Sequence, residues 1–294
     1  MTALAILGGS GQVGRALAQE ARARGIPHVA FGRAACDIAD AGAVERAILG
    51  ARLVVNCAAY TAVDRAEAEE ERAHEVNGLG AGTVAQKCAE VGIPLIHIST
   101  DYVFDGESPR PYREDDICSP LNAYGRSKLA GEENVRKCQP AHVILRTSWI
   151  FSVQGQNFVT TILRLARSEP ELRVVHDQVG GPTAAEDIAK TILDIMEAIC
   201  EGPDPIQWGT YHFAGAPAVS WYGFARAIVG ESGPPVVPIA TEEFPRPARR
   251  PRNSVFDCTR IGRAFGITQP DWRPRVAELR ATFGQASIYH VTHP

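Results

Sequence analysis

The sequence predicts an α/β protein with a Rossmann-like, doubly wound parallel sheet and a smaller, interleaved C-terminal domain. Three observations indicate this class. Short apolar runs alternate with helical stretches through the first half of the chain. A glycine-rich turn joins the first apolar run to the first helical stretch. Beyond about residue 148, loops rich in glycine and proline interrupt the alternation.

Composition excludes several classes of protein. The chain has 294 residues and a formal net charge of −4, which gives no electrostatic footprint for nucleic acid. We expect no membrane segment, because no apolar run reaches the ~18 residues that a membrane-spanning helix needs. We expect no secretion signal, because the first residues show no basic region or small-residue cleavage site. The seven cysteines stand singly, without a C-x-x-C pair, so we expect reduced thiols in a cytoplasmic protein.

The first expected element is a buried strand over residues 3–7, because that run is continuously apolar. Gly8, Gly11 and Gly14 follow with G-x-x-G-x-x-G spacing, and a helical stretch covers residues 15–24. This context predicts a dinucleotide-binding turn, in which the backbone approaches a pyrophosphate and the helix N-terminus supplies N–H groups. A purely structural glycine turn is the alternative. The cofactor contacts expected here are Gly8, Ser10, Gly11, Gln12, Val13 and Gly14.

The second expected strand, residues 28–31, leads to Arg33. An NAD-selective site usually carries Asp or Glu near this point to bind the ribose 2′-hydroxyl. An arginine can instead pair with a 2′-phosphate, which favours NADPH, with NADH as the alternative cofactor. A solvated loop arginine is the competing interpretation. Asp37 and Ile38, just before a helix that Asp40 is expected to cap, complete this set of cofactor contacts.

A third apolar run, residues 52–57, leads into small residues that would let a cofactor lie close to the backbone. Simple tight packing is the alternative reason for their size. The expected contacts are Cys57, Ala58, Ala59, Tyr60 and Thr61. A long helical stretch over residues 66–91 then crosses to a fourth strand at residues 94–98.

Ser99 and Thr100 end the fourth strand, and Tyr124 is followed four residues later by Lys128. Positions i and i+4 share one helix face, and Asn122 suits the N-cap of that helix. We expect the ammonium to lower the phenol pKa from about 10, so that the pair can transfer a proton to or from a sugar or alcohol oxygen. A Ser or Thr hydroxyl would hold that oxygen. The Tyr-x-x-x-Lys spacing also arises by chance, so its weight depends on its surroundings.

The second half of the chain is expected to contain the fifth strand, three further helices and one more strand, at residues 141–146, 158–167, 184–200, 221–229 and 211–213. No flexible linker separates two blocks of sequence. We therefore predict a dinucleotide-binding domain of residues 1–148 and 183–230. An interleaved substrate-binding domain would take residues 149–182 and 231–294.

Taken together and in this order, these motifs resemble the extended short-chain dehydrogenase/reductase superfamily. Longer stretches are similar to the dTDP-4-dehydrorhamnose reductase family, and the similarity runs from residue 3 to about residue 280. Those stretches are residues 11–14, 56–64, 99–106, 146–149, 177–178, 181–183, 220–222 and 250–254.

This resemblance implies an oxidoreductase that uses NADPH to reduce the 4-keto group of a dTDP-linked 6-deoxy-sugar, dTDP-4-dehydro-L-rhamnose. It implies that Tyr124 protonates the C4 oxygen, Lys128 holds the nicotinamide ribose, and Thr100 hydrogen-bonds the substrate. Ser99 is the less favoured hydroxyl for that task and is placed with the cofactor contacts. The positions matched to the sugar nucleotide are Val63, Thr100, Asp101, Tyr102 and Trp149. For Trp149, an ordinary core tryptophan is the alternative.

The same residues bear on related activities. Sugar-nucleotide 4,6-dehydratases have Asp-Glu after the threonine, whereas Asp101 is followed here by Tyr102, so no second carboxylate serves as the base for elimination. A 4-epimerase retains its NAD, and Arg33 favours an exchanging NADPH instead. A non-catalytic regulatory subunit, like the β subunit of methionine adenosyltransferase, shares the motifs and stays open.

Two further features were left without a catalytic role. The basic segment of residues 246–252 either meets the substrate diphosphate or is a solvated loop. We predict no metal site, because the position at which some family members carry a magnesium-binding glutamate is Ala16, which leaves Glu186 alone. A homodimer, which that metal site supports in those members, stays open.

Overall fold

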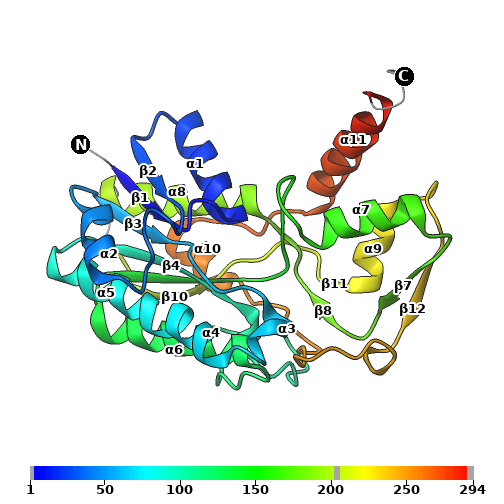
Figure 1. Ribbon diagram of the computed structural model, residues 1–294, viewed down its shortest axis with the longest axis horizontal. Helices are drawn as coiled ribbons and strands as arrows, with labels where there is room; N and C mark the ends of the chain where they lie inside the picture. The colour runs from blue at the N-terminus through cyan, green and yellow to red at the C-terminus, as the bar shows by residue number, and fades with distance from the viewer. Residues whose placement is uncertain (1–2, 202–205, 290–294) are drawn as a thin grey trace.

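The computed structural model describes residues 3–201 and 206–289. Its centre is a six-stranded sheet with the order β10-β5-β4-β3-β1-β2, and all neighbouring strands run parallel. This order confirms the predicted doubly wound fold, because the chain starts on the interior strand β1, runs to β2 at one edge, and then crosses back to β3 and on towards β10 at the other edge (Figure 1). The strands are β1 (Leu4–Leu7), β2 (His28–Phe31), β3 (Leu53–Asn56), β4 (Leu95–Thr100), β5 (His142–Thr147) and β10 (Gly209–His212).

Helices cover both faces of the sheet. One core cluster joins the sheet to α1 (Gln12–Ala23), α8 (Ala185–Glu201) and α10 (Thr259–Phe265). A second cluster, on the opposite face, joins it to α2 (Ala41–Ile48), α5 (Ala81–Glu90) and α6 (Ala123–Cys138). The central strands β1, β3, β4 and β5 are buried along their whole length, as their continuous apolar runs predict. Within the described residues, no helix combines the length and apolar character needed to cross a bilayer.

The expected helix over residues 66–91 is four shorter pieces. They are α3 (Val63–Ala66), α4 (Glu70–His74), a π-helical turn η1 (Glu75–Gly80) and α5. The turn holds buried Asn77, whose side chain bonds the backbone of Tyr60 outside the helix. A π-turn inserts an extra residue into the helical ladder and is common at functional sites. The predicted helical stretch is therefore present over residues 70–90, but α3 is separate from it and the π-turn interrupts its regular α-helical hydrogen bonding.

A smaller part lies beside the carboxyl ends of the strands (Figure 1). It contains α7 (Phe158–Ser168), α9 (Trp221–Val229) and α11 (Arg273–Tyr289) around the parallel pair β7 (Leu172–Val175) and β12 (Val236–Ile239). Four two-residue strands form two further pairs: β8 (Val179–Gly180) pairs with β11 (Val219–Ser220), and β6 (Ile150–Phe151) pairs with β9 (Thr183–Ala184). A short 3-10 turn, η3 (Thr241–Glu243), follows β12.

The packing shifts the expected boundary between the two parts. Helix α9 falls in the stretch expected to belong with the nucleotide-binding half, but Phe224 and Ile228 pack into the smaller core with Phe151 and Trp272. Helix α10, expected in the smaller part, packs instead on the large sheet through Ile261. The amphipathic pattern of a helix predicts which of its faces is buried. It does not predict which part of the protein that face packs against, because this depends on the path of the chain.

Candidate active site

The glycine turn brings the ends of β1 and β3 together. Gly8 has a φ of +80°, and a Cβ there would lie 2.5 Å from the backbone nitrogen of Ala58. At Gly14, a Cβ would collide with the carbonyl oxygen of Gly8. Glycine is therefore required at both positions. No side chain caps the N-terminus of α1 at Gly11, so the first backbone N–H groups of that helix are left for a ligand such as a phosphate.

The end of β2 carries the residues expected to distinguish NADPH from NADH. Arg33 is exposed and forms an ion pair with Asp37, with 3.4 Å between Nε and Oδ2. Ser10, in the glycine turn, lies close to Gly32, the residue before Arg33. Ile38 is buried beneath this surface, among the apolar residues of α2 and α5. The exposed guanidinium can therefore meet a phosphate while keeping its carboxylate neighbour.

The loop that follows β3 is fixed by a residue that sequence reasoning missed. Asn77 accepts from the N–H of Tyr60 at 2.8 Å and donates to the carbonyl of Tyr60 at 3.0 Å. Its Nδ2 also donates to the hydroxyl of Ser127 on α6, at 2.9 Å. Asn77 thus ties the expected cofactor loop of residues 57–61 to the helix that carries Tyr124. The only sequence signal was a polar residue beside Gly78 inside an otherwise helical run.

The expected catalytic stretch is assembled at the end of β4. Asn122 caps α6 by accepting from the N–H of Gly125 at 2.8 Å, as predicted. The ring of Tyr124 packs edge-on against Tyr102, with 5.6 Å between centroids. The hydroxyl of Thr100 lies near enough to the phenol of Tyr124 to lower its pKa. The structure therefore brings Thr100, Tyr102 and Tyr124 together from segments that the sequence separates.

The predicted lowering of the Tyr124 pKa by Lys128 is wrong for this structure. Burial raises the pKa of Tyr124 to about 12, the charge of Asp101 raises it further, and the bond with Thr100 opposes both effects. Lys128 is turned towards β4, where its Nζ donates to the carbonyl of Ile98 at 2.7 Å. Burial lowers the pKa of Lys128 to about 8. At neutral pH the phenol keeps its proton and can act as an acid.

Asp101 is the second unusual group at this point. It is buried, and burial raises its pKa to about 6. Thr100 contacts its Oδ1 at 3.1 Å, whereas its Oδ2 has no hydrogen-bond partner among the described residues. A buried carboxylate oxygen without a donor is costly, and a hydroxyl of a ligand would satisfy it.

Ser99 points away from these groups. Its hydroxyl donates to Glu132 at 2.5 Å, in a buried cluster where Glu132 also accepts from Arg146 at 2.7 and 2.8 Å. Arg136 adds a further bond to Glu132 at 2.6 Å. The Ser99 side chain is thus engaged in a structural ion-pair cluster between β4, β5 and α6.

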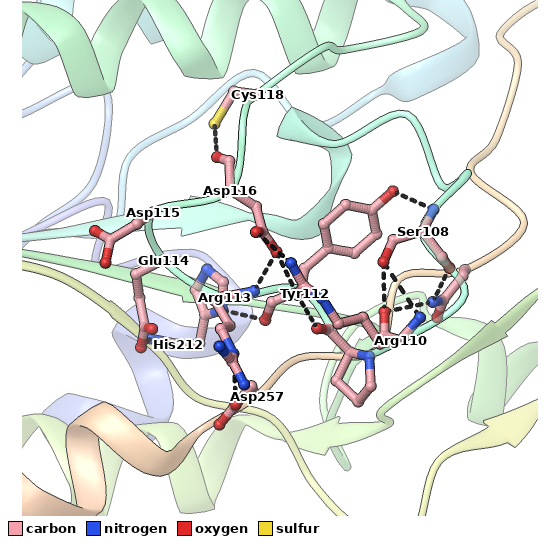
Figure 2. A network of polar contacts seen from close by, with 12 residues as sticks. Ser108, Arg110, Tyr112, Arg113, Glu114, Asp115, Asp116, Cys118, His212 and Asp257 are labelled. Atoms are coloured by element: carbon pink, nitrogen blue, oxygen red, sulfur yellow. Dashed lines mark hydrogen bonds and ion pairs between the residues drawn. The ribbon is translucent and has the colours of Figure 1, made fainter.

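The loop between Phe104 and Asn122 is held rigidly, as Figure 2 shows. Two bonds of 2.8 Å join Arg110 to Asp116, and the hydroxyl of Tyr112 donates to Asp105 at 2.7 Å. Glu114 accepts from the backbone N–H of His212, which links the loop to β10. Because the loop runs directly into α6, these bonds help to fix the start of the helix that carries Tyr124.

A cavity of about 640 Å³ opens between the two parts beside Tyr102. Aromatic side chains and arginines dominate its wall. They are Tyr102, Phe158, Trp221, Phe244, Arg173, Arg246, Arg249, Arg250 and Arg252. Aromatic faces suit a base, and arginines suit phosphate oxygens. The basic segment that the sequence left open therefore lines a cavity.

Three expected substrate residues support this cavity in different ways. Trp149 has a φ of +48° and stacks flat on Trp221, with 3.4 Å between ring centroids, so it backs a wall residue. Tyr102 lines the cavity itself. Val63 begins α3, next to Asp64, which accepts from Arg250 at 2.6 Å and so orients an arginine of the wall.

The residues do not fit the magnesium site of some relatives. Ala16 and Glu186 line one pocket of about 470 Å³, together with Arg275 and Glu278. Arg275 pairs with Glu278 at 3.0 Å and with Asp187 at 3.2 Å, which places a cation between these carboxylates. No group of three metal-ligating side chains occurs in the described parts of the chain.

The doubly wound sheet, the glycine turn and the Tyr-x-x-x-Lys helix at the end of β4 define a protein of the short-chain dehydrogenase/reductase class. A family model described as the RmlD substrate binding domain matches residues 1–284. The chain belongs to this family, together with the dTDP-4-dehydrorhamnose reductases that it resembles along nearly its whole length.

Two curated relatives illustrate the similarity. The dTDP-4-dehydrorhamnose reductase of Sinorhizobium fredii is 41% identical over 284 residues, covering 94% of this chain and 96% of that protein. The enzyme of the same name from Aggregatibacter actinomycetemcomitans is 42% identical over 292 residues, covering 96% and 99%.

Solved structures agree with the fold. The dTDP-4-dehydrorhamnose reductase of Bacillus anthracis, in complex with NADP, has a TM-score of 0.87 and 35% identity, covering 95% of this chain and 98% of that one. UDP-glucose 4-epimerase from Brucella ovis, in complex with NAD, has a TM-score of 0.80 at 17% identity over 97% and 99% of the two chains. That second likeness concerns the fold alone.

Proposed function

We propose that the protein reduces the 4-keto group of dTDP-4-dehydro-L-rhamnose to give dTDP-L-rhamnose, with NADPH as the reductant. The observation that carries the proposal is the cluster of Thr100, Asp101 and Tyr124 at the end of β4, beside a cavity lined by aromatic rings and arginines. Family membership and the printed activity of full-length relatives support the same reading.

The cofactor would lie along the glycine turn and the loop after β3. Residues 8–14 and 57–61 would face it, with Arg33 and Asp37 at the 2′-phosphate end and Ile38 beneath. The free N–H groups at the start of α1 and the missing Cβ atoms of Gly8 and Gly14 fit a pyrophosphate close to the backbone. NADPH supplies a hydride to the substrate carbon when it is bound.

The protein would supply the proton and hold the substrate. Tyr124 is a protonated phenol at neutral pH, because burial raises its pKa to about 12. It donates that proton to the C4 oxygen as the carbonyl becomes an alcohol, so hydride and proton together account for both added hydrogens. Thr100 lies against Tyr124 and holds the same oxygen. The unpartnered Oδ2 of Asp101 accepts from a neighbouring sugar hydroxyl.

The cavity would hold the nucleotide end of the substrate. The stacked pair Trp149 and Trp221 offers a rigid aromatic wall, and the arginines of residues 246–252 face the diphosphate. In this division of labour the large sheet binds NADPH and the smaller part binds the sugar nucleotide.

A coupled assay tests the proposal. dTDP-glucose is converted in situ to the 4-keto-L-sugar, and NADPH oxidation is followed spectrophotometrically. We expect oxidation only when protein and keto sugar are both present, with dTDP-L-rhamnose as the product. NADPH binding without turnover would contradict the proposed enzymatic activity and favour a non-catalytic regulatory subunit. Co-purification with a methionine adenosyltransferase would identify such a subunit.

We also propose that the protein works in the cytoplasm, since the cysteines stand singly in the sequence, without a C-x-x-C pair. A homodimer stays a prediction, which light scattering on the purified protein would measure.

A further inference from the structure

Two buried side-chain oxygens lack a hydrogen-bond partner in the parts of the chain that the structure describes. One is Oδ2 of Asp101, which a sugar hydroxyl would satisfy, and the other is Oγ1 of Thr147, the last residue of β5. Thr147 is 2% exposed. A buried hydroxyl without a partner is costly, and native proteins rarely keep one without a reason. The hydroxyl of Thr147 is therefore a candidate contact for a ligand.

Other buried hydroxyls around the end of β5 find their partners within the chain. The Oγ1 of Thr183 donates to the carbonyl of Gly181 at 2.9 Å and accepts from the N–H of Gly215 at 3.2 Å. Ser148, the residue after Thr147, donates to the same carbonyl of Gly181 at 2.8 Å. Of these three buried hydroxyls, only that of Thr147 is left without a partner among the described residues.

Thr147 lies beside Thr100 at the carboxyl edge of the sheet. The two threonines are register partners on the parallel strands β4 and β5. Register partners project their side chains from the same face of a sheet, and neighbouring strands are about 4.8 Å apart. The described residues that line the cavity of about 640 Å³ include Tyr102 but not Thr147. Thr147 is thus next to the proposed reacting groups, but outside the cavity proposed for the nucleotide of the substrate.

The order of the strands gives the path of the proposed cofactor. Arg33, at the 2′-phosphate end, follows β2, and the glycine turn follows β1. The next strands in the sheet are β3, which leads into the cofactor loop of residues 57–61, then β4, and then β5. From β2 to β5 there are four strand spacings, roughly 19 Å, which suits an extended dinucleotide. This path brings the nicotinamide to the ends of β4 and β5.

The nicotinamide ring has one polar group, the carboxamide on C3. A carboxamide has a carbonyl acceptor and an NH₂ donor, and a threonine hydroxyl can pair with either. C3 is bonded to C4, the carbon that carries the hydride. A contact that holds the carboxamide also fixes the rotation of the ring about its bond to the ribose, and so decides which face of C4 is turned towards the sugar.

We propose that the hydroxyl of Thr147 hydrogen-bonds the nicotinamide carboxamide and so fixes the face of the ring from which hydride leaves. Thr100 and Tyr124, at the end of β4, hold the substrate oxygen, and Thr147 holds the reductant one strand further along the sheet. The inference rests on the proposed function for the place of the sugar and of the cofactor. The unpaired hydroxyl itself is a property of the folded chain.

Thr147→Val tests the contact through two effects of opposite sign. Valine has the shape of threonine but no hydroxyl, so the free protein no longer buries an unpaired polar atom, and its melting temperature should rise by about 2 °C or more. The Kd for NADPH should rise about three- to tenfold, because one hydrogen bond is lost. Differential scanning calorimetry of the free protein and isothermal titration calorimetry with NADPH measure these effects without any turnover.

Two probes that lack nicotinamide make the result specific. Adenosine 2′,5′-bisphosphate has the 2′-phosphate but no nicotinamide, and dTDP occupies the site proposed for the substrate nucleotide. Thr147→Val should change the Kd for each by less than about twofold. An unchanged Kd for NADPH would overturn the proposal, as would equal weakening of NADPH and the bisphosphate. Weakened dTDP with unchanged NADPH would assign the hydroxyl to the sugar nucleotide instead. A lowered melting temperature would show that the hydroxyl has a partner in the free protein, against the proposal.

Two further variants complete the test. Thr147→Ser keeps a hydroxyl, so its Kd for NADPH should stay within about twofold of the unaltered value. Thr183→Val is the matched control, because Thr183 is equally buried but its hydroxyl has two partners in the chain. It should lower the melting temperature and leave the ratio of the Kd values for NADPH and the bisphosphate unchanged. If the binding results hold and no keto sugar is reduced, the proposed function fails while the carboxamide contact stands.

Discussion

Replacing Tyr124 with phenylalanine separates the chemistry from the architecture of the site. The edge-on contact of its ring with Tyr102 needs no hydroxyl, so it persists. The variant loses the interaction of its hydroxyl with Thr100, which contributes no more than a hydrogen bond of about 0.5–1.5 kcal/mol, and it no longer buries a phenol oxygen. These effects oppose each other, so we expect the free energy of unfolding to change by less than about 1 kcal/mol.

Turnover should fall much further. Removing a positioned general acid costs about 10²- to 10⁴-fold in rate, or roughly 3–5 kcal/mol of transition-state stabilisation. Because the phenylalanine ring keeps the shape of the site and the glycine turn is untouched, we expect the Kd for NADPH to change by less than about threefold, equivalent to less than about 1 kcal/mol.

The assay is NADPH oxidation under saturating keto sugar, with Kd measured separately by fluorescence of the bound nicotinamide. Tyr112→Phe is the matched control. Tyr112 is also a buried tyrosine with one side-chain acceptor, Asp105, but it stacks on Phe104 away from the proposed reacting atoms. A Tyr124→Phe protein that turns over at the unaltered rate would refute the assignment of the acid. Equal losses in both variants would point to a structural effect.

Three more changes test other parts of the structure. Arg33→Ala should weaken the binding of NADPH by about tenfold and leave the binding of NADH nearly unchanged, since a charged hydrogen bond contributes about 1.5 kcal/mol. An unchanged ratio of the two Kd values would exclude a 2′-phosphate contact. Asp101→Asn should raise the free energy of unfolding near pH 7 by about 2 kcal/mol, because burial raises the folded-state pKa to about 6, above the unfolded value of about 3.9. The destabilisation by the buried Asp101 charge is absent at pH values below the pKa of the unfolded state, and it develops as the pH rises through the pKa of the folded state. Urea titrations near pH 4 should therefore show no gain in the free energy of unfolding of Asp101→Asn. Arg146→Met should lower the free energy of unfolding by about 3–5 kcal/mol, because it leaves Glu132 buried without its main partner. Arg136→Met removes a partly exposed and therefore weaker partner of Glu132, so it should lower the free energy of unfolding by less than about 2 kcal/mol. Equal losses in the two variants would contradict this ranking.

The sequence determined the elements whose causes are local. A continuous apolar run forms a buried strand wherever it occurs, so β1, β3, β4 and β5 could be predicted within one or two residues. The caps Asp40 and Asn122 act on the next turn of their own helices, and both bind the backbone N–H groups expected of an N-cap. The glycine turn likewise depends on backbone freedom that the residue type alone supplies.

Only the tertiary structure decided which groups meet. The direction of Lys128, the raised pKa of Tyr124 and the π-helical turn at Asn77 depend on partners that lie 30 or more residues away, or on burial by other elements. Thr100 and Thr147 become neighbours only because β4 and β5 pair in one register. Helical spacing places Tyr124 and Lys128 on one face, but the dielectric and the hydrogen-bond partners around that face arise when distant segments pack together.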